Sequence, residues 1–122
     1  MSLEISVRRL DNVAVVDLNG RVTLGEASGR LRDTIKDLIT NNGKDILLNL
    51  AGVSYMDSSG LGELVGAFAT VSNRGGKLKL LGLQPRLHEL MHITKLYTVF
   101  EIFTDEAQAV RSFHTGGAVA KG

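Results

Sequence analysis

The spacing of apolar residues changes repeatedly along the chain, and these changes predict strands that alternate with helices. Between Leu24 and Thr40 the apolar residues recur at helical spacing with charged residues between them, which is typical of an amphipathic helix. The segment from Lys44 to Leu50 is apolar almost without interruption, which is typical of a buried strand. Along the whole chain, the spacing of apolar residues predicts strands near 5–7, 13–18, 44–50, 77–81 and 99–103. It predicts helices near 24–40, 58–73, 85–94 and 105–113.

Turn-forming residues separate these segments. The pair Asp11–Asn12 suits a turn between the first two strands, and Gly20 is expected to end the second strand. Residues 41–43 should end the first helix, because Asn and Gly tolerate the left-handed conformation of a helix cap. Pro85 suits the first position of a helix, where a missing N–H costs nothing. An opening hairpin followed by alternating strands and helices predicts an α/β fold with a largely parallel sheet.

The composition indicates one soluble domain. The 122 residues include no cysteine, which excludes disulfides and cysteine-ligated zinc. The 14 basic and 13 acidic residues nearly balance, so neither nucleic acid nor a membrane is an expected partner. No apolar run is long enough to span a bilayer, and the N-terminus lacks the features of a signal peptide, so a cytoplasmic location is expected. We therefore predict one domain over residues 1–115, a flexible tail at 116–122 and no cofactor.

An acid, two hydroxyl residues and a glycine lie where the buried strand turns into the next helix: Asp57-Ser58-Ser59-Gly60. Ser and Asp are favoured there because their side-chain oxygens accept hydrogen bonds from unpaired first-turn amides. One interpretation is therefore a helix cap and nothing more. The other is a serine placed for phosphorylation, and these residues alone do not decide between the two.

The sequence around this junction resembles the signature of STAS-domain anti-sigma factor antagonists, the anti-anti-sigma factors of bacterial sporulation and stress responses. The matching segments are 46–50 (Ile-Leu-Leu-Asn-Leu) and Met56–Gly62, and the positions of Gly75–Gly76 and Pro85 agree as well. The resemblance implies a STAS fold, a mixed sheet of four to five strands flanked by about four helices. It also implies a binding module that is not an enzyme.

In that family the first serine after the aspartate is phosphorylated, and by position this serine is Ser58. The resemblance implies two partners: an anti-sigma factor serine kinase with a histidine-kinase-like ATPase fold, and a metal-dependent serine phosphatase. Phosphate would add about −1.5 to −2 charges beside Asp57 and release the anti-sigma factor. The chain departs from the family at Thr23, where an acidic residue is typical. Thr23, Asp57, Ser58 and Ser59 are predicted members of the partner-binding surface.

The helix after Ser58 contains small residues on one face. Gly62, Gly66 and Thr70 follow one another at intervals of four, so they share a face. Each glycine inside a helix costs about 1 kcal/mol relative to alanine, so a close neighbour is expected there. Either another element of the domain packs against this face, or Gly62, Glu63 and Gly66 belong to a flat surface that binds a partner helix.

The sequence also offers alternatives to an anti-sigma factor antagonist. The segment His88-Glu89-Leu90-Met91-His92 matches the H-E-x-x-H pattern of zinc hydrolases, but the apolar residues of this helix place both histidines on its polar side. A serine hydrolase is disfavoured because no glycine lies two residues before Ser58, and no Walker-type lysine loop is present. The last alternative is a STAS domain of a lipid-transport or other signalling assembly, with Ser58 only as a helix cap.

Overall fold

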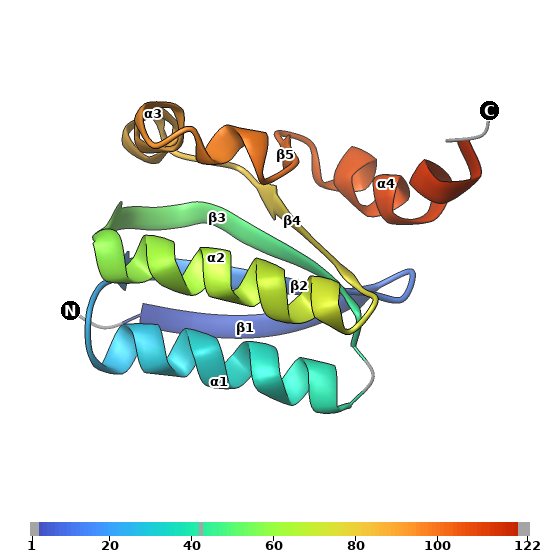
Figure 1. Ribbon diagram of the computed structural model, residues 1–122, viewed down its shortest axis with the longest axis horizontal. Coiled ribbons are helices and arrows are strands. Elements are labelled where there is room, and N and C mark those ends of the chain that lie inside the picture. The colour runs from blue at the N-terminus through green and yellow to red at the C-terminus, as the bar shows by residue number, and fades with distance from the viewer. Residues whose placement is uncertain (1–2, 42, 120–122) are drawn as a thin grey trace.

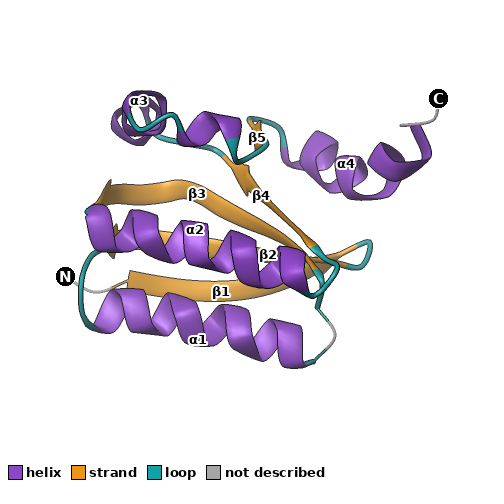
Figure 2. Cartoon of the chain, in the orientation of Figure 1, coloured by secondary structure: helices purple, strands orange, loops and turns teal. Residues whose placement is uncertain are grey.

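The computed structural model describes residues 3–41 and 43–119 of the chain, which form one mixed β-sheet with helices on both faces (Figure 1). The strands lie in the order β1-β2-β3-β4-β5; β1 is antiparallel to β2, and the later pairs are parallel. This arrangement confirms the predicted α/β fold, a mixed sheet flanked by helices. The elements are β1 (Leu3–Leu10), β2 (Val13–Val22), α1 (Glu26–Thr40), β3 (Asp45–Met56), α2 (Ser58–Asn73), β4 (Lys77–Leu81), α3 (Pro85–Ile93), the 3-10 helix η1 (Leu96–Thr98), β5 (Ile102–Phe103) and α4 (Glu106–Val119) (Figure 2).

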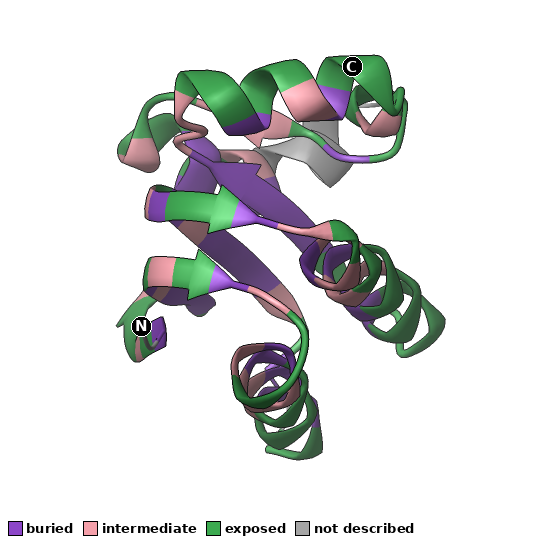
Figure 3. Ribbon diagram, turned by 90° about the vertical axis from the view of Figure 1, so that its left-hand side faces the viewer, coloured by how far each residue is buried: buried purple, intermediate pink, exposed green. Residues whose placement is uncertain are grey.

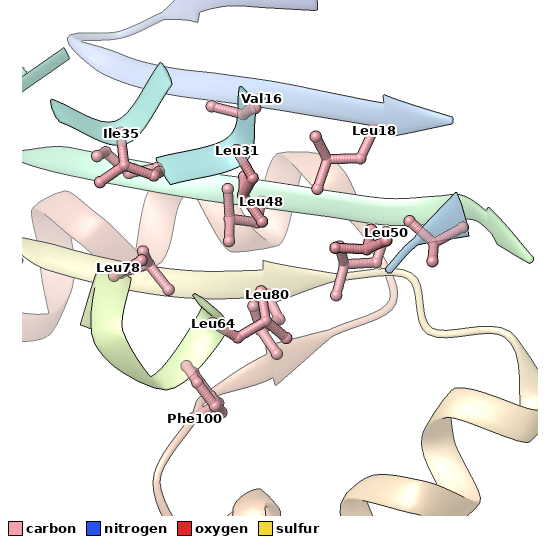
Figure 4. Close-up of a cluster of buried hydrophobic side chains, with 14 of the residues drawn as sticks. Val16, Leu18, Leu31, Ile35, Leu48, Leu50, Leu64, Leu78, Leu80 and Phe100 are labelled. Atoms are coloured by element: carbon pink, nitrogen blue, oxygen red, sulfur yellow. The ribbon is translucent and has the colours of Figure 1, made fainter. Parts of the chain in front are cut away.

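Two apolar layers join the sheet to the helices, because successive residues of a strand point to opposite faces. On one face Val16, Leu48 and Leu80 lie in the same cluster as Leu31 of α1 and Leu64 of α2 (Figure 4). Burying one such side chain contributes about 1.5–3 kcal/mol. Buried residues accordingly concentrate in the strands and on the inner sides of the helices (Figure 3). A smaller cluster on the other face joins the sheet to α4, and its members are Val13, Val15, Leu47, Leu81, Ala109, Val110 and Phe113.

Several elements have the predicted bounds. Helix α2 spans Ser58–Asn73 and β4 spans Lys77–Leu81, as their periodicity predicted. The turn between β1 and β2 is confirmed as well, since Asp11 and Asn12 have φ values of 49° and 68°. Pro85 is the first residue of α3, as predicted.

The prediction that Gly20 ends β2 is wrong. The strand passes through a register shift after Gly20 and continues to Val22, and β3 continues beside it to Met56. Periodicity missed the second half of β3 because exposed residues such as Tyr55 interrupt its apolar run. Because Val22 pairs with Met56, the two strands end together and the loops that follow them lie side by side.

Helix α1 ends at Thr40, as predicted, and the left-handed cap expected within residues 41–43 is not formed by Asn41. The next residue, Asn41, has a φ of −96°, and Asn42 lies outside the described residues. Gly43 has a different role: its N–H donates to the carbonyl oxygen of Leu38 at 2.6 Å, and a Cβ on Gly43 would lie 2.8 Å from that oxygen. A glycine is therefore needed there for close approach to the end of α1.

The C-terminal elements differ in length from the prediction. Strand β5 contains only Ile102 and Phe103, since the preceding residues 96–98 form the 3-10 helix. Helix α4 reaches Val119, six residues beyond the predicted end at Phe113, so its backbone includes the first part of the predicted tail. Residues 120–122 lie outside the described residues, and the flexibility of the tail stays a prediction.

Lys79 of β4 helps to hold α4 against the sheet. Its ammonium group donates to the carbonyl and hydroxyl oxygens of Ser112 at 3.3 and 2.9 Å, and it pairs with Glu101 at 2.8 Å. The same group lies 4.8 Å from the centre of the Phe113 ring. A buried charge is tolerated only with such partners, so Lys79 links β4 to the middle of α4.

Candidate functional site

The carboxylate of Asp57 connects two loops at the ends of β2 and β3. Asp57 is the N-cap of α2: its Oδ1 accepts a hydrogen bond from the N–H of Gly60 at 2.9 Å. Its Oδ2 accepts from the N–H of Leu24, in the loop between β2 and α1, at 3.1 Å. The Gly60 bond and then the Leu24 bond lower the pKa of this carboxyl, because both stabilise its charged form. Asp57 therefore fixes the start of α2 relative to the loop before α1.

Gly60 allows α2 to begin directly against the strand ends. The residue is buried, and a Cβ built on it would lie 2.5 Å from the carbonyl oxygen of Val22 and 2.5 Å from Cγ of Met56. No side chain fits at that distance without displacing the helix. This glycine of the signature thus sets the distance between α2 and β2.

Ser58 is the first residue of α2 and is exposed, whereas Ser59 is half-buried. The helix is capped by Asp57, so the interpretation of Ser58 as the capping residue does not fit this structure. Ser58 instead is an exposed residue in the first turn of the helix, at the positive end of the helix dipole.

Thr23 lies in the loop that Asp57 holds. Its carbonyl oxygen accepts hydrogen bonds from the N–H and the hydroxyl of Ser28, at 3.2 and 2.7 Å, which fold the loop back onto the start of α1. Leu24, the next residue, donates to Asp57 and leaves 78% of its surface exposed. The structure thus brings Thr23 and Asp57 into adjacent loops, as the sequence implied, and adds Leu24, which sequence reasoning missed.

The glycine face of α2 is open. Gly62 and Gly66 are exposed, and a Cβ on either would meet no atom within 4 Å. The alternative that another described element packs against these glycines is therefore wrong. Glu63 lies beside this face and forms an ion pair with Arg32 of α1, and with Gly66 and Thr70 it lines a shallow cavity of about 170 Å³ between the two helices.

A second cavity, of about 680 Å³, opens beside Ser58 and was not predicted. We call it the Ser58 groove. It lies between the end of β3, the start of α2 and helix α3, which share one edge of the molecule in Figure 1. No sequence signal marked it, because α3 reaches this edge only through the tertiary arrangement. Its lining residues are Val53, Ser54, Tyr55, Met56, Asp57, Ser58, Leu61, Gln84, Arg86, Leu87, Glu89, Leu90, Ile93 and Thr94.

The H-E-x-x-H segment on α3 does not form a metal site in the described part of the chain. His88 and His92 are both exposed, as expected, and the ring of His92 stacks on Tyr97 with 4.8 Å between centroids. Across residues 3–41 and 43–119, no three His, Cys, Asp or Glu side chains are arranged to hold a metal ion. In the same residues, no helix is long and apolar enough to cross a membrane.

Comparison with known proteins agrees with the fold and with the signature. The STAS-domain family model matches residues 4–109. An anti-sigma-B factor antagonist of Bacillus subtilis (strain 168) is 37% identical over 102 residues, which cover 84% of this chain and 92% of that protein. The chain has a STAS domain, and it belongs to the STAS-domain family of anti-sigma factor antagonists.

Three solved structures, two of them of the same protein, show the same fold at low sequence identity. An anti-sigma factor antagonist from Mycobacterium paratuberculosis has a TM-score of 0.78 at 18% identity, with 91% of this chain and 93% of that chain covered. The Bacillus cell fate determinant SpoIIAA in its phosphorylated form has a TM-score of 0.70 at 22% identity, with 88% and 97% covered. SpoIIAA has also been solved in its unphosphorylated form, with a TM-score of 0.68 at 22% identity and 88% and 96% covered.

Proposed function

We propose that this protein binds an anti-sigma factor and that phosphorylation of Ser58 releases it. The observation that carries the proposal is the exposed Ser58 hydroxyl at the first position of α2, next to an Asp57 that already caps the helix. The names of the relatives support an antagonist of anti-sigma factors, and the two forms of SpoIIAA support a phosphorylation switch. In this role the protein is a cytoplasmic binding module and not an enzyme.

The position of Ser58 makes a phosphate compatible with the fold. Negative charge near a helix N-terminus is favourable by about 0.3–1 kcal/mol, so the protein need not unfold to be modified. A partner surface matched to Asp57 and a neutral hydroxyl would instead meet about −1.5 to −2 additional charges. A loss of about 3 kcal/mol in binding lowers the affinity more than a hundredfold, which suffices for a switch.

Two enzymes complete the proposed cycle. The anti-sigma factor itself, an ATPase of the histidine-kinase-like type, phosphorylates Ser58, and a metal-dependent serine phosphatase removes the phosphate. Thr23, Ser59, and the open face with Gly62, Glu63 and Gly66 are proposed to contribute to partner binding. Because Thr23 carries no charge, the loop beside Ser58 is less negative than the acidic loop typical of the family.

Pull-down from a lysate of the source organism tests the proposal. The baits are wild type, Ser58→Ala, Ser58→Asp and, as a matched control, Ser72→Asp, which adds the same charge to an exposed serine at the other end of α2. We expect an ATPase-type kinase to be retained by wild type, Ser58→Ala and Ser72→Asp and lost with Ser58→Asp. Recovery of the same partners by all four baits would contradict the switch and would favour a STAS domain of another assembly.

A further inference from the structure

The Ser58 groove has a largely apolar lining beside the serine. Its wall contains Met56, Leu61 and Leu90 together with Asp57 and Ser58 themselves. Among the large hydrophobic residues of the described chain, Leu24 and Ile93 are the most exposed, at 78% and 70%. Ile93 lines the groove, and Leu24 is hydrogen-bonded to Asp57. Exposed apolar side chains gathered around a pocket are typical of a protein-binding site.

Two unpaired charges also line the groove. The side chains of Arg86 and Glu89 form no hydrogen bond or ion pair with other residues of the described chain. Both belong to α3, and both lie beside the apolar residues Leu87 and Leu90 of the same helix. A complementary partner surface would therefore place an apolar side chain in the groove, an acidic group near Arg86 and a basic group near Glu89.

We propose that the Ser58 groove binds an apolar side chain of the kinase that phosphorylates Ser58, and that the same kinase carries the two complementary charges. This inference rests on the proposed function. Because Ser58 and Asp57 form part of the groove wall, a kinase whose active site reaches the Ser58 hydroxyl has to cover the groove. The groove then supplies affinity for the kinase, and the phosphate on Ser58 supplies the switch.

The test compares how tightly the kinase binds Ile93→Glu and two variants in which an exposed valine outside the groove is replaced by glutamate. The probe is the purified ATPase-type kinase that wild type retains and Ser58→Asp does not. Ile93 is 70% exposed, so its replacement should leave the fold intact, which thermal unfolding verifies. Val7→Glu, on β1, and Val65→Glu, on the open side of α2, introduce the same charge at residues that are 43% and 39% exposed.

We expect Ile93→Glu to raise the Kd for the kinase at least tenfold and to lower kcat/KM for phosphorylation of Ser58 by a similar factor. Val7→Glu should stay within about twofold of wild type, as surface changes outside an interface do. Arg86→Glu should also weaken binding, because it would repel an acidic group of the kinase.

The possible outcomes distinguish the groove proposal from the proposed phosphorylation switch. If Ile93→Glu binds the kinase as wild type does while Ser58→Asp does not, the groove proposal is overturned and the phosphorylation switch stands. If Val65→Glu loses binding while Ile93→Glu does not, the kinase binds through α2 and not through the groove, and the groove proposal is overturned. If wild type retains no partner sensitive to Ser58→Asp, both proposals fail. A change in the sedimentation of the chain alone on Ile93→Glu would identify the groove as a contact between copies of this protein.

Discussion

At the scale of single residues, Asp57 is the most constrained member of the site, because its two carboxylate oxygens accept hydrogen bonds from two different loops. These bonds lower its pKa in the folded state. The stability that they add is therefore fully present above the ordinary aspartate pKa of about 3.9 and is lost as the pH falls through the lower folded value.

Asp57→Asn should consequently lower the melting temperature by a few degrees at neutral pH, since asparagine has one side-chain oxygen and can accept only one of the two hydrogen bonds, without the charge that strengthens them. The difference from wild type should stay constant down to about pH 5 and shrink below about pH 4. Urea unfolding of wild type and Asp57→Asn across pH 3–7 measures this difference in stability. A difference that persists unchanged at pH 3 would contradict a role for the Asp57 charge.

Two glycines of α2 should respond in opposite ways to the same substitution. Gly60→Ala would place a methyl group 2.5 Å from the Val22 carbonyl oxygen and should lower the free energy of unfolding by about 1–3 kcal/mol. Gly66→Ala meets nothing within 4 Å and should raise it by about 0.5–1 kcal/mol, because alanine is the better helix former. Denaturant unfolding of both variants checks the pair, and equal effects would contradict the close contact at Gly60.

At the scale of elements, the sequence predicted best where one physical signal dominates. Helix α2 and strand β4 have clear periodicity between strong end signals, and their bounds were correct. The second half of β3 lacked a continuous apolar run because Ser54 and Tyr55 are exposed, so it was missed. For the site, the signature located Asp57 and Ser58, but the groove depends on where α3 lies in space, and no local pattern encodes that position.

The attachment of α4 is a second element-scale feature that the sequence did not reveal. Lys79 looks like an exposed strand lysine, yet it is buried against Ser112 and Phe113. Lys79→Ala should lower the free energy of unfolding by about 2–4 kcal/mol, because it leaves a cavity under α4 and removes the hydrogen bonds to Ser112. Amide hydrogen exchange in α4 should accelerate first, since this helix loses its contact with β4.

The control for Lys79 is Lys77→Ala, an exposed lysine on the same strand, which should change stability by less than about 0.5 kcal/mol. Lys79→Met keeps most of the side-chain volume without the charge and should recover more than half of the loss, because packing and not charge is the larger contribution. Equal stability of Lys79→Ala and Lys77→Ala would show that α4 is held by its apolar cluster alone.

At the scale of the whole molecule, the residues proposed to bind the partner differ from the residues that form the hydrophobic core. The residues proposed to bind the partner lie on the loops after β2 and β3, on the outer side of α2 and on α3, with the loops at the carboxyl ends of the two strands (Figure 1). The core that holds the sheet together lies between the strands and the helices. A charge added at Ser58 should therefore change what the molecule binds while leaving how it folds unchanged.

Ser58→Asp and Ser72→Asp test this separation with one substitution at opposite ends of α2. An acidic residue in the first turn should raise the free energy of unfolding by about 0.3–1 kcal/mol, and one in the last turn should lower it by a similar amount, because the helix dipole reverses sign between the two ends. Amide NMR shifts in Ser58→Asp should be confined to the segments near 22–25 and 57–61. If those shifts spread into β4 and α4, the charge is altering the fold, and release of a partner would then be conformational and not electrostatic.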